Sequence, residues 1–174
     1  FEGDASGLTL SFSISGTGAG DGFGQAVITR QDLDGDGLDD LVVGAPMASV
    51  EEDSSGAAYI FYTPFRSDLD LSDADEVISG DTTGDELGLA LTAVDDWDGD
   101  GGVDILLSAP GYGDDNGRAY LIQPLGLGDG VSASSVAYAT FDGGEGRFGT
   151  AASANGDLDG DGFTDVIIGA PDTD

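Results

Sequence analysis

The stretch Asp32-Leu33-Asp34-Gly35-Asp36-Gly37-Leu38-Asp39-Asp40 places aspartates at positions one, three, five and nine of a short segment. Two like unit charges about 4 Å apart repel by roughly 4 kcal/mol at an effective dielectric constant of about 20, so clustered carboxylates need a positive charge among them. Calcium accepts about six to eight oxygens from carboxylates, backbone carbonyls and water. We therefore predict a calcium loop, with ligands from Asp32, Asp34, Asp36, the Leu38 carbonyl and Asp40.

The residues after this loop distinguish it from an EF-hand. An EF-hand loop carries Glu at position twelve and leads into a helix, but Val43 stands at that position here. Leu41-Val42-Val43 is instead a β-branched run that is typical of a buried strand. We therefore expect a calcium loop that lies between two strands.

The same loop occurs three times, at residues 32–40, 96–104 and 157–165. A single Asp/Gly-rich segment could also be a solvated turn, but three copies with identical Asp spacing strongly favour metal binding. We predict three Ca²⁺ sites. The ligands expected in the second and third loops are Asp96, Asp98, Asp100, the Gly102 carbonyl and Asp104, and Asp157, Asp159, Asp161, the Phe163 carbonyl and Asp165.

Charge and composition restrict the partners of this 174-residue chain. It carries 35 acidic and four basic residues, a net charge of −31, and three Ca²⁺ ions would still leave about −25. Nucleic acids and anionic membrane surfaces both require basic patches, so we exclude them as partners. No stretch is apolar enough to insert into a membrane. The acidity suits a salty or calcium-rich exterior, so we expect an extracellular or cell-surface, secreted location.

Self-comparison finds a repeat that extends beyond the loops. Residues 23–46 align without a gap to 87–110 at an offset of 64, and to 148–171 at an offset of 125. Each unit opens with a large apolar residue and Gly, and closes with a small residue, Ala and Pro. The opening pairs are Phe23-Gly24, Leu87-Gly88 and Phe148-Gly149, and the closing triplets are Gly44-Ala45-Pro46, Ser108-Ala109-Pro110 and Gly169-Ala170-Pro171.

Strand patterns fill the rest of each unit. Four short strands in a period of about 60 residues are typical of a propeller blade. The segment 8–14 matches a fourth strand, because residues 13–16 align with 77–80 at the offset of 64. Strands are expected at 25–30, 39–44, 57–62 and 75–79 in the first unit, and at 89–94, 103–108, 118–123 and 134–140 in the second.

We therefore predict an all-β fold, a partial β-propeller of four-stranded antiparallel blades. Two blades are complete and one is split between the termini: residues 1–22 give the outer strand of a preceding blade, 23–86 blade 1, 87–147 blade 2 and 148–174 the first half of blade 3. Propellers close with roughly four to eight blades. Either the chain is a fragment of a longer propeller, which we favour, or copies complete one another through edge strands.

The Phe-Gly opening, the Asp-x-Asp-x-Asp-Gly-x-x-Asp loop and the Gly-Ala-Pro closing together resemble the FG-GAP repeats of the integrin α-subunit β-propeller and of related secreted bacterial proteins. The resemblance covers nearly the whole chain. It implies a seven-bladed propeller in the full family member, with calcium loops between the first two strands of a blade on the lower face and ligands on the opposite face. Leu87 and Ser108 depart mildly from the pattern, and this chain holds fewer repeats than a seven-bladed ring.

Three functions are compatible with these features. The first is a non-catalytic, calcium-stabilised binding or adhesion module for a protein or glycan ligand; loops 47–56 and 111–117 could contact it, or be solvated acidic connectors. The second is a self-assembling structural subunit of an extracellular filament or layer. The third is a carbohydrate-active enzyme that uses loop carboxylates. Without His or Cys, a Ser/His/Asp triad, a Cys/His nucleophile and a His-ligated zinc site are excluded within this chain.

Four large apolar residues have expected positions. Phe23, Leu87 and Phe148 open the three units and should lie in the core. Trp97, at the second position of the second loop, is expected to pack against the neighbouring blade. The alternative for Trp97 is an outward stacking surface for a sugar or a protein partner.

Overall fold

The computed structural model describes residues 12–16, 18–50 and 52–173, and these residues form almost entirely β structure. Short helical turns interrupt the strands: the 3-10 turn η1 (Leu71–Asp73), α1 (Tyr112–Asp115) and α2 (Ala133–Val136). None of these described turns is long and apolar enough to cross a membrane. The strands are β1 (Ile14–Ser15), β2 (Ala26–Gln31), β3 (Asp40–Ala45), β4 (Ala57–Phe61), β5 (Leu69–Asp70), β6 (Glu76–Ser79), β7 (Leu91–Val94), β8 (Asp104–Ala109), β9 (Arg118–Ile122), β10 (Val131–Ser132), β11 (Ala139–Asp142), β12 (Ala151–Gly156) and β13 (Asp165–Gly169).

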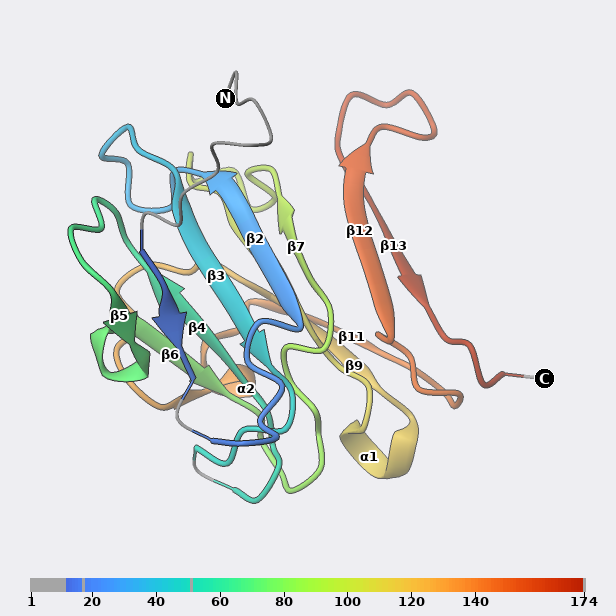
Figure 1. The fold of residues 1–174 in the computed structure, drawn as a ribbon. Coiled ribbons are helices and arrows are strands. Elements are labelled where there is room, and N and C mark those ends of the chain that lie inside the picture. Colours follow the sequence, from blue (N-terminus) through green and yellow to red (C-terminus); the bar gives the residue numbers. More distant parts are fainter. Residues whose placement is uncertain (1–11, 17, 51, 174) are drawn as a thin grey trace, which may run out of the picture.

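Each repeat unit forms its own sheet. In the first unit β2, β3, β4 and β6 pair as an antiparallel meander, and in the second unit β7, β8, β9 and β11 do the same. In the third unit β12 and β13 form an antiparallel pair. The predicted class, an all-β partial propeller, is therefore confirmed, and its first strands β2, β7 and β12 lie side by side with β7 in the middle (Figure 1).

The sheets stack face to face through two apolar layers. Strand alternation sends Val42 and Ile60 of the first sheet toward Ile105 and Ile122 of the second, and all four are fully buried. The opposite face of the second sheet, with Leu106 at its centre, packs against β12 and β13. Both faces of the second sheet are thus covered by neighbouring units, which is the arrangement that repeat proteins need because a single unit cannot bury both of its faces.

The opening and closing motifs recur because they contact each other. Within each unit, the glycine of the opening pair donates its N–H to the first carbonyl of the closing triplet, at 3.0 Å from Gly24 to Gly44, 2.9 Å from Gly88 to Ser108 and 2.9 Å from Gly149 to Gly169. Between units, a Cβ on Gly44 would lie 2.1 Å from the Gly88 carbonyl oxygen. Only glycine allows that backbone contact between the first and second units.

The opening residues lie as expected, with different degrees of burial. Leu87 is fully buried between the first two sheets. Phe23 is half-buried and meets Tyr59 edge to face, with the ring centroids 5.8 Å apart. Phe148 is half-buried against the layer between the second and third sheets. All three therefore contact core residues.

The pairing at the N-terminal side repeats within the molecule. β10 of the second unit pairs in parallel with β6 of the first, at Val131 with Ile78. β5 pairs in parallel with β1 in the same way, at Leu69 with Ile14. β1 thus occupies, relative to the first unit, the place that β6 occupies relative to the second. Of the strand expected at residues 8–14, only residues 12–14 are described, and residues 8–11 lie outside the described part of the chain.

One predicted strand was partly wrong. Residues 133–136 form α2, and the fourth strand of the second unit begins only at Ala139. Side-chain hydrogen bonds hold this turn: Ser134 donates from N and Oγ to Asp81 Oδ1 at 3.2 and 2.7 Å, and Ser135 Oγ donates to the Ser132 carbonyl at 2.6 Å. Serine side chains that bond locally in this way compete with extended structure.

Candidate metal centres

The three acidic loops connect equivalent strands, β2 to β3, β7 to β8 and β12 to β13. In each, the aspartate at position one folds the loop around its own carboxylate. Asp32 Oδ1 accepts the Gly35 N–H at 2.7 Å and Oδ2 accepts the Gly37 N–H at 2.9 Å. Asp96 and Asp157 accept the same pair of N–H groups in their loops. Equal spacing in the sequence therefore produces equal local structure.

Glycines at positions four and six make this turn possible. All six have positive φ, and in the first loop φ is 82° at Gly35 and 90° at Gly37. No atom lies within 4 Å of a Cβ built at either position, so space is not the constraint. The backbone conformation itself requires glycine there.

Each loop gathers three carboxylates. One oxygen from each member lies within 4.8 Å of the others, which is close enough for a shared cation. We call these three sets the triads. They are Asp32, Asp34 and Asp36 in the first loop, Asp96, Asp98 and Asp104 in the second, and Asp157, Asp159 and Asp165 in the third.

Three predicted carboxylate ligands lie outside the triads. In the first loop each oxygen of Asp40 accepts a backbone N–H, with Leu33 N at 2.8 Å from Oδ2 and Thr63 N at 2.8 Å from Oδ1. Asp100 accepts a hydrogen bond from the Gln123 side-chain amide. Asp161 Oδ1 accepts the Phe163 N–H at 2.9 Å. Ligation by these side chains, and by the carbonyls of Leu38, Gly102 and Phe163, stays a prediction.

The second loop contains a buried carboxylate oxygen without a donor. Asp104 is fully buried, and Trp97 N donates to its Oδ2 at 2.7 Å, but its Oδ1 has no hydrogen-bond partner. Pairing of β8 with β9 places Pro124 where the first unit has Thr63. Proline has no N–H, so the donor that satisfies Asp40 Oδ1 is missing beside Asp104.

Burial determines the electrostatics of this group. Burial raises the pKa of the Asp104 carboxyl, while its contacts with the Tyr138 hydroxyl and the Trp97 N–H lower it. The Tyr138 hydroxyl lowers the pKa of the Asp104 carboxyl by hydrogen bonding to it. Oδ1 is the oxygen of this carboxylate that has no hydrogen-bond donor. An unpaired buried carboxylate oxygen is costly unless a cation compensates it.

The donor set fits a hard divalent cation. Each triad offers carboxylate oxygens alone, and the chain has neither His nor Cys to attract a softer metal. The unpaired Asp104 Oδ1 is an additional acceptor that points to such an ion in the second loop. The described residues thus contain three acidic clusters that could hold metal ions.

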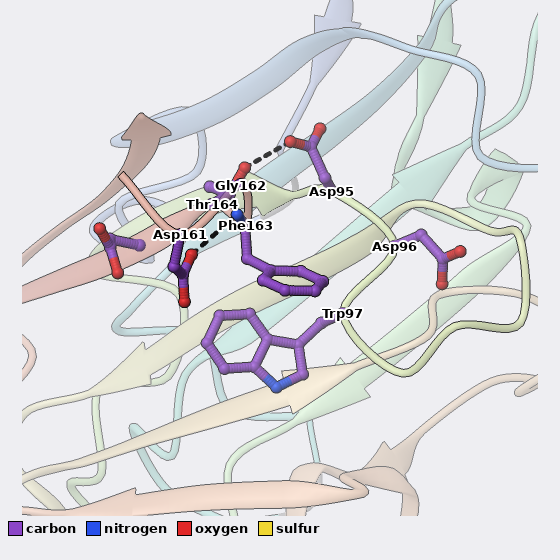
Figure 2. A pocket seen from close by; sticks show the side chains of 8 residues that line it. Asp95, Asp96, Trp97, Asp161, Gly162, Phe163 and Thr164 are labelled. Carbon is purple, nitrogen blue, oxygen red and sulfur yellow. Dashed lines mark hydrogen bonds between the residues drawn. The ribbon is translucent and has the colours of Figure 1, made fainter. Parts of the chain in front are cut away.

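The side-chain environment of Trp97 differs from the packed position that we expected. Its ring is 45% exposed and lines a cleft of about 470 Å³ between the second and third loops, opposite Phe163 (Figure 2). Asp95 and Thr164 also line this cleft, and neither was among the predicted site residues. Neither residue recurs at the repeat offsets, where Gln31 and Asp39 stand in the first unit, so periodicity could not find them.

The two candidate contact loops have structural contacts of their own. In loop 111–117, the Tyr112 ring lies 4.0 Å from the Arg118 guanidinium carbon, and Asp115 forms an ion pair with Arg147 at 2.5 Å. Arg147 also pairs with Glu86 and so links the second unit to the end of the first. In loop 47–56, Glu51 lies outside the described residues. A ligand-contact role for either loop stays a prediction.

Comparison with known proteins finds sequences that are similar to this chain. The model of the FG-GAP repeat family matches residues 23–61 and 148–174, which include the first and third loops. Integrin alpha-4 of Xenopus laevis is 33% identical over 164 residues, integrin alpha-PS2 of Drosophila melanogaster 31% over 173, and human integrin alpha-IIb 33% over 155.

These matches cover most of the chain but little of each relative. They include 94%, 94% and 85% of this chain, respectively. The chain spans only 16%, 12% and 14% of the length of these relatives. The repeat motifs, the stacked sheets and the aligned relatives agree, and the chain therefore contains FG-GAP repeats and is similar to integrin α subunits.

Proposed function

We propose that the chain is a non-catalytic, calcium-stabilised part of an extracellular adhesion module. The observation that carries the calcium proposal is the fully buried Asp104 with its unpaired Oδ1, set within one of three carboxylate triads. Ca²⁺ prefers carboxylate and carbonyl oxygens, and it would supply the positive charge that this arrangement lacks. The role of Ca²⁺ would be structural, because each triad lies in the loop that connects the first two strands of a unit.

The similarity to integrin α subunits supports a role in adhesion. The relatives match most of this chain but only a small part of their own length, so the proposal concerns the repeat region alone and not a whole integrin subunit. We propose a protein ligand and a cell-surface location. The absence of His and Cys leaves carboxylates as the main reactive groups, and three sets of them are assigned to metal in this proposal.

We further propose that the repeat units correspond to blades. Residues 23–86 and 87–147 would be complete blades, 148–174 the start of a third and 1–22 the outer strand of a preceding one. The parallel pairing of β1 with β5, which repeats that of β10 with β6, supports the last assignment. Ile167, 56% exposed on the outer face of β13, supports a further blade packed there in a longer propeller.

Titration calorimetry tests the calcium proposal loop by loop. We expect three bound Ca²⁺ ions per chain, one for each triad. Asp36→Ala removes a first-loop ligand and should reduce the number of tightly bound ions by one, while Asp39→Ala, beside the same triad, should leave the number unchanged. An unchanged number in Asp36→Ala, or no binding by the wild-type chain, would contradict the proposal.

A further inference from the structure

The chain contains two asparagines, and each is followed by glycine, at Asn116-Gly117 and Asn155-Gly156. Such a pair is chemically labile, because a glycine without a side chain lets its backbone nitrogen approach the carboxamide of the asparagine. Asn116 ends the turn α1 and is exposed to water. Loop 96–104 and α1 lie at opposite ends of β8, and Figure 1 shows α1 away from the third acidic loop as well. The Asn116 pair is therefore separate from the candidate metal centres.

The first unit shows that the repeat requires this glycine but not the asparagine. Gly56 is equivalent to Gly117, and a Cβ at either position would lie 2.4 or 2.1 Å, respectively, from the carbonyl oxygen of the next unit's opening residue. Glycine is needed at both positions because the two backbones touch there. The residue before it is a fully buried Ser55 in the first unit but an exposed Asn116 in the second. The carboxamide is therefore specific to the second unit.

In the folded turn, both groups that would react are engaged in other contacts. The Gly117 N–H, whose nitrogen is the nucleophile, donates to the Tyr112 carbonyl at 2.9 Å. Asn116 Nδ2, the leaving group, donates to the Gly113 carbonyl at 2.6 Å. Ring closure requires the nitrogen and the carboxamide carbon to meet in one orientation, so both hydrogen bonds must break first. The reaction therefore needs the turn to open.

Residues 147–149, which we call the docking segment, hold the turn closed. Arg147 N donates to the Asp115 carbonyl at 2.8 Å, and Phe148 N donates to the Asn116 carbonyl at 3.3 Å. Arg147 Nη1 also forms an ion pair with Asp115 Oδ1 at 2.5 Å. The docking segment leads directly into β12. The turn is therefore closed as long as the third unit is packed against the second.

We propose that Asn116 is a self-modification site that reacts when the docking segment leaves the turn. The Gly117 nitrogen then bonds to Asn116 Cγ, and the bond from Cγ to Nδ2 breaks. The proton of the Gly117 N–H leaves with Nδ2 as ammonia, and a cyclic imide remains. Water adds to one of the two imide carbonyls and opens the ring to aspartate or to isoaspartate. Water is the only other reactant.

The isoaspartate product keeps the two units apart. Its backbone contains one extra carbon atom, and the former main-chain carbonyl of residue 116 becomes part of a side-chain carboxylate. The hydrogen bond from Phe148 N cannot re-form in the same register, and the contact at Gly117 leaves no space for a longer backbone. The new charge also lies next to Asp114 and Asp115 in the sequence. The modification thus makes a transient opening between the second and third units permanent.

Peptide mapping by mass spectrometry measures the reaction directly. The protein is incubated in excess calcium at mildly alkaline pH in isotopically labelled water, which marks each product, and chromatography separates aspartate from isoaspartate. Native protein should deamidate at Asn116 at least about tenfold more slowly than the chain unfolded in urea, because only the locally opened form reacts. Equal rates in the native and the unfolded chain would overturn the proposal.

Variants test whether the docking segment controls the rate. Arg147→Ala removes the ion pair with Asp115 and should speed up deamidation of the native protein about twofold to fivefold. Glu86→Gln is the matched control, because it weakens the other ion pair of Arg147, outside the turn, and should leave the rate unchanged. Asn116→Ser copies the first unit and should abolish the reaction at this position. Equal rates in Arg147→Ala and Glu86→Gln would contradict the proposed control.

Hydrogen exchange tests the consequence for the third unit. The isoaspartate form, purified after incubation, should lose amide protection in β12 and β13 relative to the unmodified protein. Asn116→Asp carries the same charge without the extra backbone carbon and should keep that protection. If the isoaspartate form were protected as well as Asn116→Asp, the modification would not hold the units apart and the proposal would fail.

Discussion

At the residue scale, one position explains why loops of the same sequence pattern differ. Asp40 and Asp104 are equivalent and both are buried, but only Asp40 has donors for both oxygens. The difference is Thr63 in the first unit against Pro124 in the second. We infer that the second loop depends more strongly on a cation than the first.

Pro124→Ala tests this inference, because it restores an N–H at the position where Thr63 donates. In EDTA the variant should be more stable than wild type by about 1–2 kcal/mol, since Asp104 Oδ1 gains a hydrogen bond to a buried charge. With calcium the gain should shrink. Urea unfolding in both conditions measures this. Pro171→Ala, at an exposed proline, is the control for the entropy change of the unfolded chain.

A result for Pro124→Ala equal to that for Pro171→Ala in EDTA would contradict this account. The carbonyl of residue 124, which accepts the Tyr62 hydroxyl at 2.7 Å, is retained in the variant, so that contact does not confuse the comparison.

The glycines of the loops give a second prediction. Gly37→Ala should lower the free energy of unfolding by about 1–3 kcal/mol, because φ is 90° there and an L side chain is strained at that angle. Gly144→Ala is the control, since its φ is not positive and no atom lies within 4 Å of its Cβ position. Urea unfolding should give a lower free energy of unfolding for Gly37→Ala than for Gly144→Ala. Equal free energies would show that the loop backbone does not require glycine at position 37.

Much of the candidate site could be predicted from single residues. The Asp spacing and the glycines located all three loops, because each turn is formed by hydrogen bonds within the loop. The membership of the triads could not be predicted. In the first two loops, the predicted ligands outside the triads accept hydrogen bonds from other segments, Asp40 from Thr63 and Asp100 from Gln123, which only the paired strands bring near.

At the element scale, the contact between successive units sets the stability of the stack. Gly44→Ala should lower the free energy of unfolding by roughly 2–3 kcal/mol, because its Cβ would lie 2.1 Å from the Gly88 carbonyl oxygen and the first two units would have to separate. Gly169→Ala is the matched control in the third unit, where the nearest atom to the Cβ is Ala151 Cβ at 3.7 Å.

The free energy of unfolding of Gly169→Ala should differ from that of wild type by no more than about 0.5 kcal/mol. Chemical unfolding in excess calcium compares the two variants. If both changed stability equally, the close contact between units would not be what requires glycine.

The strands themselves were largely predictable. Alternation and the repeat offset placed the strands of the first unit within one or two residues of β2, β3, β4 and β6. Prediction of 134–140 as one strand was partly wrong, because alternation there is weak and Ser134 bonds to Asp81 from the neighbouring unit. That hydrogen bond depends on how the units pack.

At the scale of the whole molecule, the stack creates features that no single unit contains. The cleft between Trp97 and Phe163 exists because two loops from successive units lie next to each other (Figure 2). Its lining residues Asp95 and Thr164 have no periodic signal, so only the arrangement of the units reveals them. The apolar layers could be foreseen from strand alternation, but the order of loops around the stack could not.

The most direct measurement for the central claim is thermal unfolding of the wild-type chain with excess calcium and with EDTA. If cations hold the triads together, folding and metal binding are coupled, and chelation should lower the Tm by many degrees. Magnesium at the same concentration should protect less, because it demands a stricter geometry of its ligands. Equal Tm values in calcium and in EDTA would contradict the account.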